Sequence, residues 1–259
     1  MPASENLERA RVKDLPLTRL LPNLLTLLSL CSGLTGIRFA LQEKWQEAVM
    51  AIVIAAVFDV LDGRVARLLN IASKFGAELD SLSDAISFGV APGFIMYQWT
   101  LQDDKNVGWI SVLVYAVCSA LRLARFNTML EDNSQPAWAK SYFTGVPAPA
   151  GAGLALLPLM LVLAFGTDVQ WPPMVIAFWL LMAGGLMVSR MPTLSLKGLR
   201  VAPVWVAPIM MAAVLLIAGI ATHPWFTLSL ASMLYFASLP LGWINYRLRQ
   251  IREAKSIVQ

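Results

Sequence analysis

Four aspartates lie at regular spacings in a stretch of the sequence that is flanked by long apolar runs. Asp59 and Asp62 are three residues apart, and Asp80 and Asp84 are four residues apart, so on helices each pair would share one face. A charge at the centre of a membrane-spanning helix costs roughly 2.5–3.5 kcal/mol even on lenient insertion scales. Four facing carboxylates therefore call for cations between them. Mg²⁺ or Mn²⁺ suits oxygen ligands of this kind, and two such ions about 4 Å apart assist phosphoryl displacement.

Small and basic residues accompany the aspartates. A glycine beside or one turn before an aspartate leaves the backbone open to a flat ligand, and Arg67 could hold a phosphate through a bidentate contact. Ser73 and Lys74 lie in the turn that would fold one aspartate pair against the other. A single charged residue at a helix end is most simply an interfacial charge, but this combination favours a phosphate site. Its candidate contacts are Gly63, Arg67, Ser73, Lys74 and Gly76.

The composition places this site in a membrane protein. Of the 259 residues, 58% are hydrophobic and only 14% are charged, and the mean hydropathy is +0.64. Lipid tolerates only helices or closed barrels, and these apolar segments do not alternate as barrel strands would. We therefore expect an all-α, polytopic integral membrane helix bundle. Windows of about 20 apolar residues predict eight transmembrane helices, near 21–40, 48–69, 84–101, 107–126, 146–166, 171–189, 202–221 and 225–244.

The placement of basic residues predicts the orientation. With eight spans, all but three of the 20 Lys and Arg residues fall on the side of the membrane where the N-terminus lies. The exceptions are Arg38, Lys44 and Lys105. The positive-inside rule puts this side, with both termini, in the cytoplasm. The net charge of +4 is then topological, which argues against nucleic-acid binding. We expect a cytoplasmic segment at 1–19 that could form a surface helix, a transmembrane domain at 20–246 with its core at about 20–200, and a basic cytoplasmic tail at 247–259.

The aspartate stretch resembles a known signature. The spacing D-x2-D-G-x2-A-R-x8-G-x3-D-x3-D matches residues 59–84 without a gap and resembles the motif of the CDP-alcohol phosphatidyltransferases, membrane enzymes of phospholipid synthesis. The resemblance implies two divalent metals, Mg²⁺ or Mn²⁺, and a homodimer with six spans around the site, which the eight predicted here exceed. It implies that the metal ligands are Asp59, Asp62, Asp80 and Asp84, and that Asp84 is also the general base.

The same resemblance implies a binding site for CDP-diacylglycerol. Gly63, Arg67 and Ser73 would line the CDP and its diphosphate. The segment "PNLLT" at 22–26 resembles the part of the first span that contacts the nucleotide. The expected CDP-diacylglycerol site therefore comprises Asn23, Thr26, Gly63, Arg67, Ser73, Lys74 and Gly76.

Three further stretches resemble the branch of the family whose acceptor alcohol is serine. They are "CSALRLARFN" at 118–127, "YFTGVPAPAGA" at 142–152 and "SRMPTLSLKGLR" at 189–200; the branch commonly has leucine and serine where this chain has Val146 and Ala148. The carboxylate of serine needs a cation and its ammonium group needs an acceptor. Basic and polar residues at the cytoplasmic ends of the fourth and sixth spans could supply them, and the candidates are Arg122, Arg125, Asn127 and Lys197.

The resemblance thus predicts transfer of the phosphatidyl group of CDP-diacylglycerol to L-serine, giving phosphatidylserine and CMP. It implies a bacterial cytoplasmic membrane and a site that faces the cytoplasm. A sister enzyme that uses glycerol 3-phosphate, an inositol compound or choline would share every core residue and differ only in the acceptor pocket. A cation transporter would also contain functional carboxylates within the membrane. Against a transporter, the charges gather at the cytoplasmic face, and nothing acidic lines the outer half of a predicted span.

Overall fold

The computed structural model describes residues 20–69, 71, 73–131, 142–166, 171–189, 192–194 and 203–257. The predicted surface helix in segment 1–19 and the candidate serine ligand Lys197 lie outside the described residues. The described elements are α2 (Leu21–Ala40), α3 (Trp45–Leu68), α4 (Lys74–Asp84), η3 (Ala85–Val90), α5 (Ala91–Met96), η4 (Tyr97–Leu101), α6 (Lys105–Glu131), β1 (Tyr142–Thr144), α7 (Ala148–Phe165), α8 (Pro173–Val188), β2 (Pro192–Leu194), α9 (Pro203–Thr222) and α10 (Pro224–Ile257).

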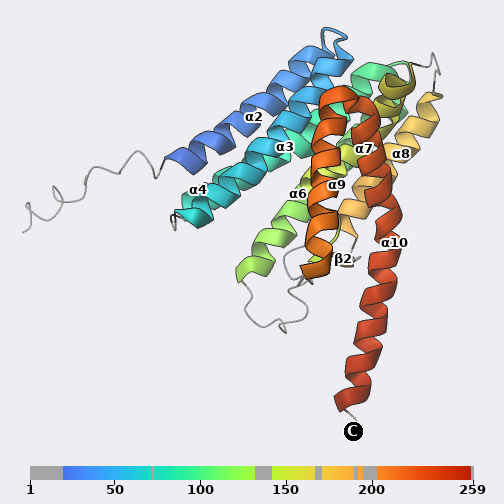
Figure 1. Cartoon of the computed structure of the whole chain (residues 1–259). Coiled ribbons are helices and arrows are strands. Elements are labelled where there is room, and N and C mark those ends of the chain that lie inside the picture. The colour runs from blue at the N-terminus through green and yellow to red at the C-terminus, as the bar shows by residue number, and fades with distance from the viewer. Residues whose placement is uncertain are drawn as a thin grey trace, which may run out of the picture.

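Helices dominate the described structure and confirm the predicted all-α membrane fold (Figure 1). Each of the eight predicted spans lies in, or within a few residues of, a helix or a run of consecutive helical segments. By length and composition, α2, α7 and the Asn106–Thr128 part of α6 could each cross a membrane alone. The apolar helices α8 and Val206–Thr222 are shorter. The eighth span lies in α10, which continues to Ile257 and extends well beyond the other helices (Figure 1).

The third predicted span is one helical run with two wide turns. The run begins after Ser73, whose hydroxyl accepts a hydrogen bond of 3.0 Å from the backbone N–H of Gly76 and so caps α4. The segments η3 and η4 are π-helical, and Pro92 occupies the first turn of α5. Proline has no N–H to donate, and wider turns next to it let the helix continue. The helix therefore continues past Pro92 through the third predicted span.

Small residues let the helices around the site pack closely. A Cβ added at Gly33 of α2 would lie 2.5 Å from the Ser87 hydroxyl of η3. A Cβ at Gly89 would likewise lie 2.8 Å from the Ser119 hydroxyl of α6. The η3 segment is thus held tightly between α2 and α6, which fixes the helix that carries Asp80 and Asp84 relative to both neighbours.

A short antiparallel pair of strands was not expected from the sequence. The strands β1 and β2 pair with Tyr142 opposite Leu194 and Thr144 opposite Pro192, which joins the segment before α7 to the segment after α8. Directly after β1, Gly145 has φ of +80°, and a Cβ there would lie 2.5 Å from the carbonyl oxygen of Met187. Only glycine fits such a position readily, so the sequence forces a sharp turn where the chain enters α7.

Candidate active site

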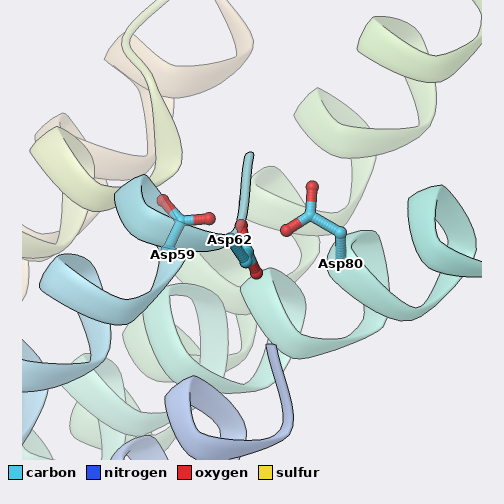
Figure 2. Close-up of side chains that lie close together, drawn as sticks. All are labelled: Asp59, Asp62 and Asp80. Carbon is cyan, nitrogen blue, oxygen red and sulfur yellow. The ribbon is translucent and has the colours of Figure 1, made fainter. Parts of the chain in front are cut away.

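Three carboxylates converge where α3 meets α4. Asp59 and Asp62 come from the last turns of α3, and Asp80 comes from the facing side of α4 (Figure 2). Each of the three offers an oxygen that lies within 4.8 Å of the others. The predicted folding of one aspartate pair against the other is thus present in the structure. One cation could contact all three carboxylates.

Asp84 lies one turn beyond Asp80 and completes the acidic cluster on the side of Asp59. The side chains of Asp59 and Asp84 lie within hydrogen-bonding reach of each other. Such a contact between two acids requires a proton or a cation between them. The Oδ1 atom of Asp84 is buried and has no hydrogen-bond partner among the described residues. A buried, unpaired carboxylate oxygen is costly, so it is a candidate ligand atom.

Hydroxyl groups of α2 hold the cluster in place. Thr26 donates a hydrogen bond of 2.6 Å to Oδ2 of Asp62, and the two side chains are only 4% and 5% exposed. Ser29 of α2 donates to the carbonyl oxygen of Ala55 on α3, at 2.9 Å. From the other side, Ser83 of α4 donates to the carbonyl oxygen of Thr26, at 3.2 Å. The helix α2 therefore fixes both α3 and α4, and Thr26 orients one of the carboxylates directly.

The donor set fits a hard divalent cation. Its atoms are all carboxylate oxygens, which Mg²⁺ and Mn²⁺ prefer. Asp80 lies in α4, ahead of the third predicted span, and its pKa is raised to about 7 by burial and then by the negative charges of Asp62 and Asp59. A cation between the carboxylates would remove that penalty. The unpaired oxygen of Asp84 and the orientation of Asp62 by the Thr26 hydroxyl also support a cation site here.

A cavity of about 130 Å³ lies on the α2 side of the cluster. Five of the seven residues predicted to contact CDP-diacylglycerol line it: Asn23, Thr26, Gly63, Ser73 and Gly76. Its wall also includes Asp62 and Asp80, so a ligand here would touch the carboxylates. No described atom lies within 4 Å of a Cβ built on Gly63, whereas one at Gly76 would meet Asn23 and Ser73 at 3.1 Å. The two glycines therefore differ, because only Gly63 faces open space.

The other two predicted contacts lie away from the wall of this cavity. Arg67 is exposed, and its Nε donates a hydrogen bond of 2.8 Å to the carbonyl oxygen of Gly63. Lys74 is exposed at the first residue of α4. Both side chains lie at the end of α3 or the start of α4, close to the cavity in sequence and unburied. Their contact with CDP-diacylglycerol stays a prediction.

A second and larger cavity, of about 380 Å³, lies on the α6 side of the cluster. It shares Asp80 and Ala77 with the first cavity, so the two meet at the carboxylates. Two of the predicted serine ligands, Arg122 and Asn127, line it. The described residues that line it are Asp59, Val60, Ala77, Asp80, Ser81, Asp84, Arg122, Leu123, Phe126, Asn127, Pro147 and Pro149.

The predicted serine ligands have different surroundings. The guanidinium of Arg122 lies over the Phe126 ring, at 5.5 Å from its centroid. It has no hydrogen bond or ion pair in the described part of the chain, although the charges of Asp84 and Asp59 act on it. Arg125, in contrast, donates a hydrogen bond of 2.8 Å to the carbonyl oxygen of Val188 at the end of α8 and does not line the cavity. Of these two arginines, Arg122 is thus the one that lines the cavity and has all of its donors available to a ligand.

Several residues at the site were not predicted from the sequence. Ser81 exchanges hydrogen bonds with Asn127 at 2.9 and 3.3 Å and so fixes the amide at the cavity wall. Pro147 and Pro149 close the cavity from the start of α7. These prolines lie in the stretch at 142–152 that resembles the serine-using branch, and this resemblance could have indicated them. Ser81 is next to the motif residue Asp80, but its hydrogen-bond partner on α6 is 46 positions away, so no local sequence pattern indicates the pair.

Comparison with known proteins identifies the class of molecule. A helical membrane protein with this carboxylate cluster between two cavities is suited to a transferase that acts on a phosphate-bearing lipid. The chain matches the family model described as CDP-alcohol phosphatidyltransferase over residues 19–189. A second model, described as CDP-alcohol phosphatidyltransferase 2, matches residues 204–240. The first match covers more than half of the chain, which belongs to the CDP-alcohol phosphatidyltransferase family.

Relatives named CDP-diacylglycerol–serine O-phosphatidyltransferase are similar to this chain. The protein of Mycobacterium leprae is 39% identical over 229 residues, which is 88% of this chain and 76% of the relative. The protein of Methanocaldococcus jannaschii is 34% identical over 161 residues, or 57% of this chain and 71% of the relative. The protein of Bacillus subtilis is 35% identical over 151 residues, or 57% of this chain and 81% of the relative. The similarity therefore extends across bacteria and an archaeon.

Proposed function

We propose that this protein transfers the phosphatidyl group of CDP-diacylglycerol to L-serine, producing phosphatidylserine and CMP. The observation that carries the proposal is the convergence of three motif carboxylates within 4.8 Å, between two cavities that share Asp80. A transfer between two substrates needs two adjoining sites at one reacting centre. The family membership and the names of the relatives support the same activity.

The smaller cavity suits the nucleotide end of CDP-diacylglycerol. Asn23, Thr26 and Ser73 offer polar side chains there, and Gly63 leaves the backbone of α3 accessible. Arg67 and Lys74, exposed at the adjoining helix ends, would attract the diphosphate from the cytoplasmic side. The acyl chains would remain in lipid, because the diphosphate of such a lipid lies at the level of the head groups.

The larger cavity suits serine. Arg122 has free donors for the carboxylate of the amino acid, and the Asn127 side chain, held by Ser81, offers an amide to the polar end of the substrate. Asp84 and Asp59 line the same wall, so the hydroxyl group of serine would lie next to them. Arg125 and Lys197 remain predicted contributors to the positive charge of this region.

The metal ligands in this proposal are Asp59, Asp62, Asp80 and Asp84. When bound, a pair of Mg²⁺ or Mn²⁺ ions would neutralise the diphosphate and stabilise the departing CMP. Asp84 is the general base. It takes the proton of the serine hydroxyl while the serine oxygen forms a bond to the phosphorus that carries diacylglycerol. The bond from that phosphorus to the oxygen of CMP breaks, and CMP leaves with the electron pair.

The setting of the reaction is part of the proposal. The distribution of Lys and Arg supports cytoplasmic termini and a site that opens to the cytoplasm. The membrane in this proposal is the cytoplasmic membrane of a bacterium. CDP and serine would enter from that side. The resemblance to the family supports a homodimer.

A panel of acceptors tests the function. The purified full-length protein would receive CDP-diacylglycerol, Mg²⁺ or Mn²⁺, and one alcohol at a time: L-serine, glycerol 3-phosphate, myo-inositol or choline. CMP release and the mass of the lipid product would be measured. We expect phosphatidylserine as the product with serine, and no CMP release in excess chelator. A preference for another alcohol would reject serine as the acceptor, while the assignment as a CDP-alcohol phosphatidyltransferase would still hold. Absence of metal-dependent CMP release would reject both.

A further inference from the structure

Tyr235 of α10 has a buried hydroxyl group without a partner. Its phenolic oxygen makes no hydrogen bond with any described residue, although its ring packs against the hydrophobic core. Buried tyrosine hydroxyls usually find a partner, because an unpaired polar group away from water is costly. A phenylalanine would fill the same space without that cost. The packing of α10 therefore does not explain why a hydroxyl group is present at this position.

The charge that acts on this hydroxyl is that of Arg122, a residue of the acceptor cavity. Tyr235 and Arg122 interact electrostatically, and Asp84 and Asp59 act on the same guanidinium. Arg122 lines the cavity of about 380 Å³, whereas Tyr235 is not among its lining residues. Tyr235 can therefore affect a ligand in this cavity through Arg122, without touching the ligand itself.

The position of Tyr235 is fixed by its neighbours in α10. Phe236, the next residue, packs against Trp179 of α8 with ring centroids 5.8 Å apart. Trp179 is itself anchored by a hydrogen bond of 2.7 Å from its indole nitrogen to the carbonyl oxygen of Leu154 on α7. One turn further along α10, Leu239 is 6% exposed. These contacts hold this part of α10 against α7 and α8, so the phenol is a preorganised group.

We propose that Tyr235 is a positioning residue that orients the guanidinium of Arg122 toward the carboxylate of the acceptor serine. The inference rests on the proposed function. The phenolic oxygen accepts one N–H of Arg122 when serine is bound. A guanidinium is a planar fork with five donors, so fixing one edge turns the remaining donors toward the cavity. The C-terminal helix pair, which lies outside the longer family match at residues 19–189, thereby contributes to acceptor recognition.

The test is Tyr235→Phe in the full-length protein, assayed with CDP-diacylglycerol micelles and L-serine. We expect KM for serine to rise about 10-fold, the loss typical of one hydrogen bond to a charged group. The kcat and the KM for CDP-diacylglycerol should stay near the wild-type values. Because Tyr235 acts through Arg122, Tyr235→Phe should cause no additional change in KM for serine when Arg122 is already replaced by Ala.

Two other tyrosines provide matched controls. Tyr97→Phe removes a hydroxyl in η4, where the ring packs against Trp109 at a centroid distance of 5.4 Å, and should leave the kinetics unchanged. Tyr115→Phe removes a buried hydrogen bond of 2.9 Å to the carbonyl oxygen of Phe88. It should lower the thermal stability without a selective change in KM for serine. This pattern is what a merely structural role of Tyr235 would also give.

Three results would overturn the inference, and the last can be told apart from the first two. If the wild type makes phosphatidylserine and Tyr235→Phe keeps its KM for serine, Tyr235 does not position Arg122 and the proposed function stands. The same conclusion follows if the effects of Tyr235→Phe and Arg122→Ala are additive. If the wild type makes no phosphatidylserine from serine, the proposed function fails and the inference fails with it.

Discussion

The hydroxyl of Thr26 on α2 donates a hydrogen bond of 2.6 Å to a carboxylate oxygen of Asp62 on α3, and both side chains are buried. This bond connects the first span to the acidic motif, 36 positions further along the chain. It occupies one lone pair of Asp62, whose carboxylate lies between those of Asp59 and Asp80 (Figure 2). Thr26 therefore has two possible roles, as a support for a metal ligand and as part of the wall of the nucleotide cavity.

Replacing Thr26 with Val should weaken metal binding and preserve the fold. The shape is kept and the hydrogen bond to Asp62 is lost. Loss of a group that orients a metal ligand typically costs about 10–100-fold in metal affinity or activity, so the Mg²⁺ or Mn²⁺ concentration for half-maximal CMP release should rise by that factor. Thr35→Val is the control, because its hydroxyl donates only to the carbonyl oxygen of Cys31 on the exposed part of α2. Equal metal dependence of both variants would contradict the supporting role of Thr26.

Replacing Asp84 with Asn should stop turnover while CDP-diacylglycerol still binds. The base is lost, and the three-carboxylate group of Asp59, Asp62 and Asp80 remains. A general base typically contributes about 10²–10⁴-fold, so less than about a tenth of the wild-type kcat should survive. Binding of CDP-diacylglycerol would be measured separately by its protection against thermal unfolding. Asp103→Asn, in the turn after η4, serves as the control. Retention of more than about a tenth of the rate would exclude Asp84 as the base.

The sequence predicted the spans and the acidic motif because both depend on local patterns. Apolar windows of about 20 residues determine the spans, and the spacing of the aspartates puts each pair on one face. Hydrogen bonds between distant segments, such as Ser81 with Asn127 and Arg125 with the carbonyl oxygen of Val188, leave no such pattern. They depend on how closely helices approach, which small residues such as Gly89 permit. The separate surroundings of Arg122 and Arg125 therefore emerge only in three dimensions.

Replacing Gly63 with Ala should reduce the binding of CDP-diacylglycerol and leave the fold intact. A Cβ at Gly63 meets no described atom within 4 Å, and alanine is the better helix former. Any harm should therefore come from a collision with bound substrate, at a cost of roughly 1–3 kcal/mol, or about 5- to 150-fold in KM for CDP-diacylglycerol. Gly185→Ala on α8 is a matched control, since its Cβ would also meet nothing within 4 Å. An unchanged KM for Gly63→Ala would argue against close approach of the nucleotide at this turn.

Single cysteines test the proposed orientation. Cys31 and Cys118 would first be replaced by Ala, which leaves no native thiol. A cysteine in place of Glu78, exposed on α4, should react with a membrane-impermeant thiol reagent only from the cytoplasmic side. A cysteine in place of Asp103 should react only from the opposite side. The expectation follows from the distribution of Lys and Arg. Labelling of both positions from the same side would overturn the predicted orientation of the third span.

Replacing each of the two α6 arginines with Ala should separate recognition from structure. Arg122 lines the acceptor cavity with unpaired donors, and a hydrogen bond to a charged group is worth roughly 1.5–3 kcal/mol. Arg122→Ala should therefore raise KM for serine about 10- to 150-fold, with a much smaller effect on KM for CDP-diacylglycerol. Lys at this position should rescue only in part, because an ammonium lacks the planar fork.

Arg125→Ala should instead lower the thermal stability in detergent, since it leaves the carbonyl oxygen of Val188 without this donor. Its KM for serine should change less than that of Arg122→Ala, because Arg125 influences the cavity only through its charge and the packing of α6 on α8. Measuring both constants for both variants distinguishes three arrangements. If Arg122→Ala raises KM for both substrates equally, its guanidinium binds the diphosphate. If only Arg125→Ala affects serine, the acceptor lies closer to α8 than proposed. A selective effect of Arg122 alone would support the serine site at the larger cavity.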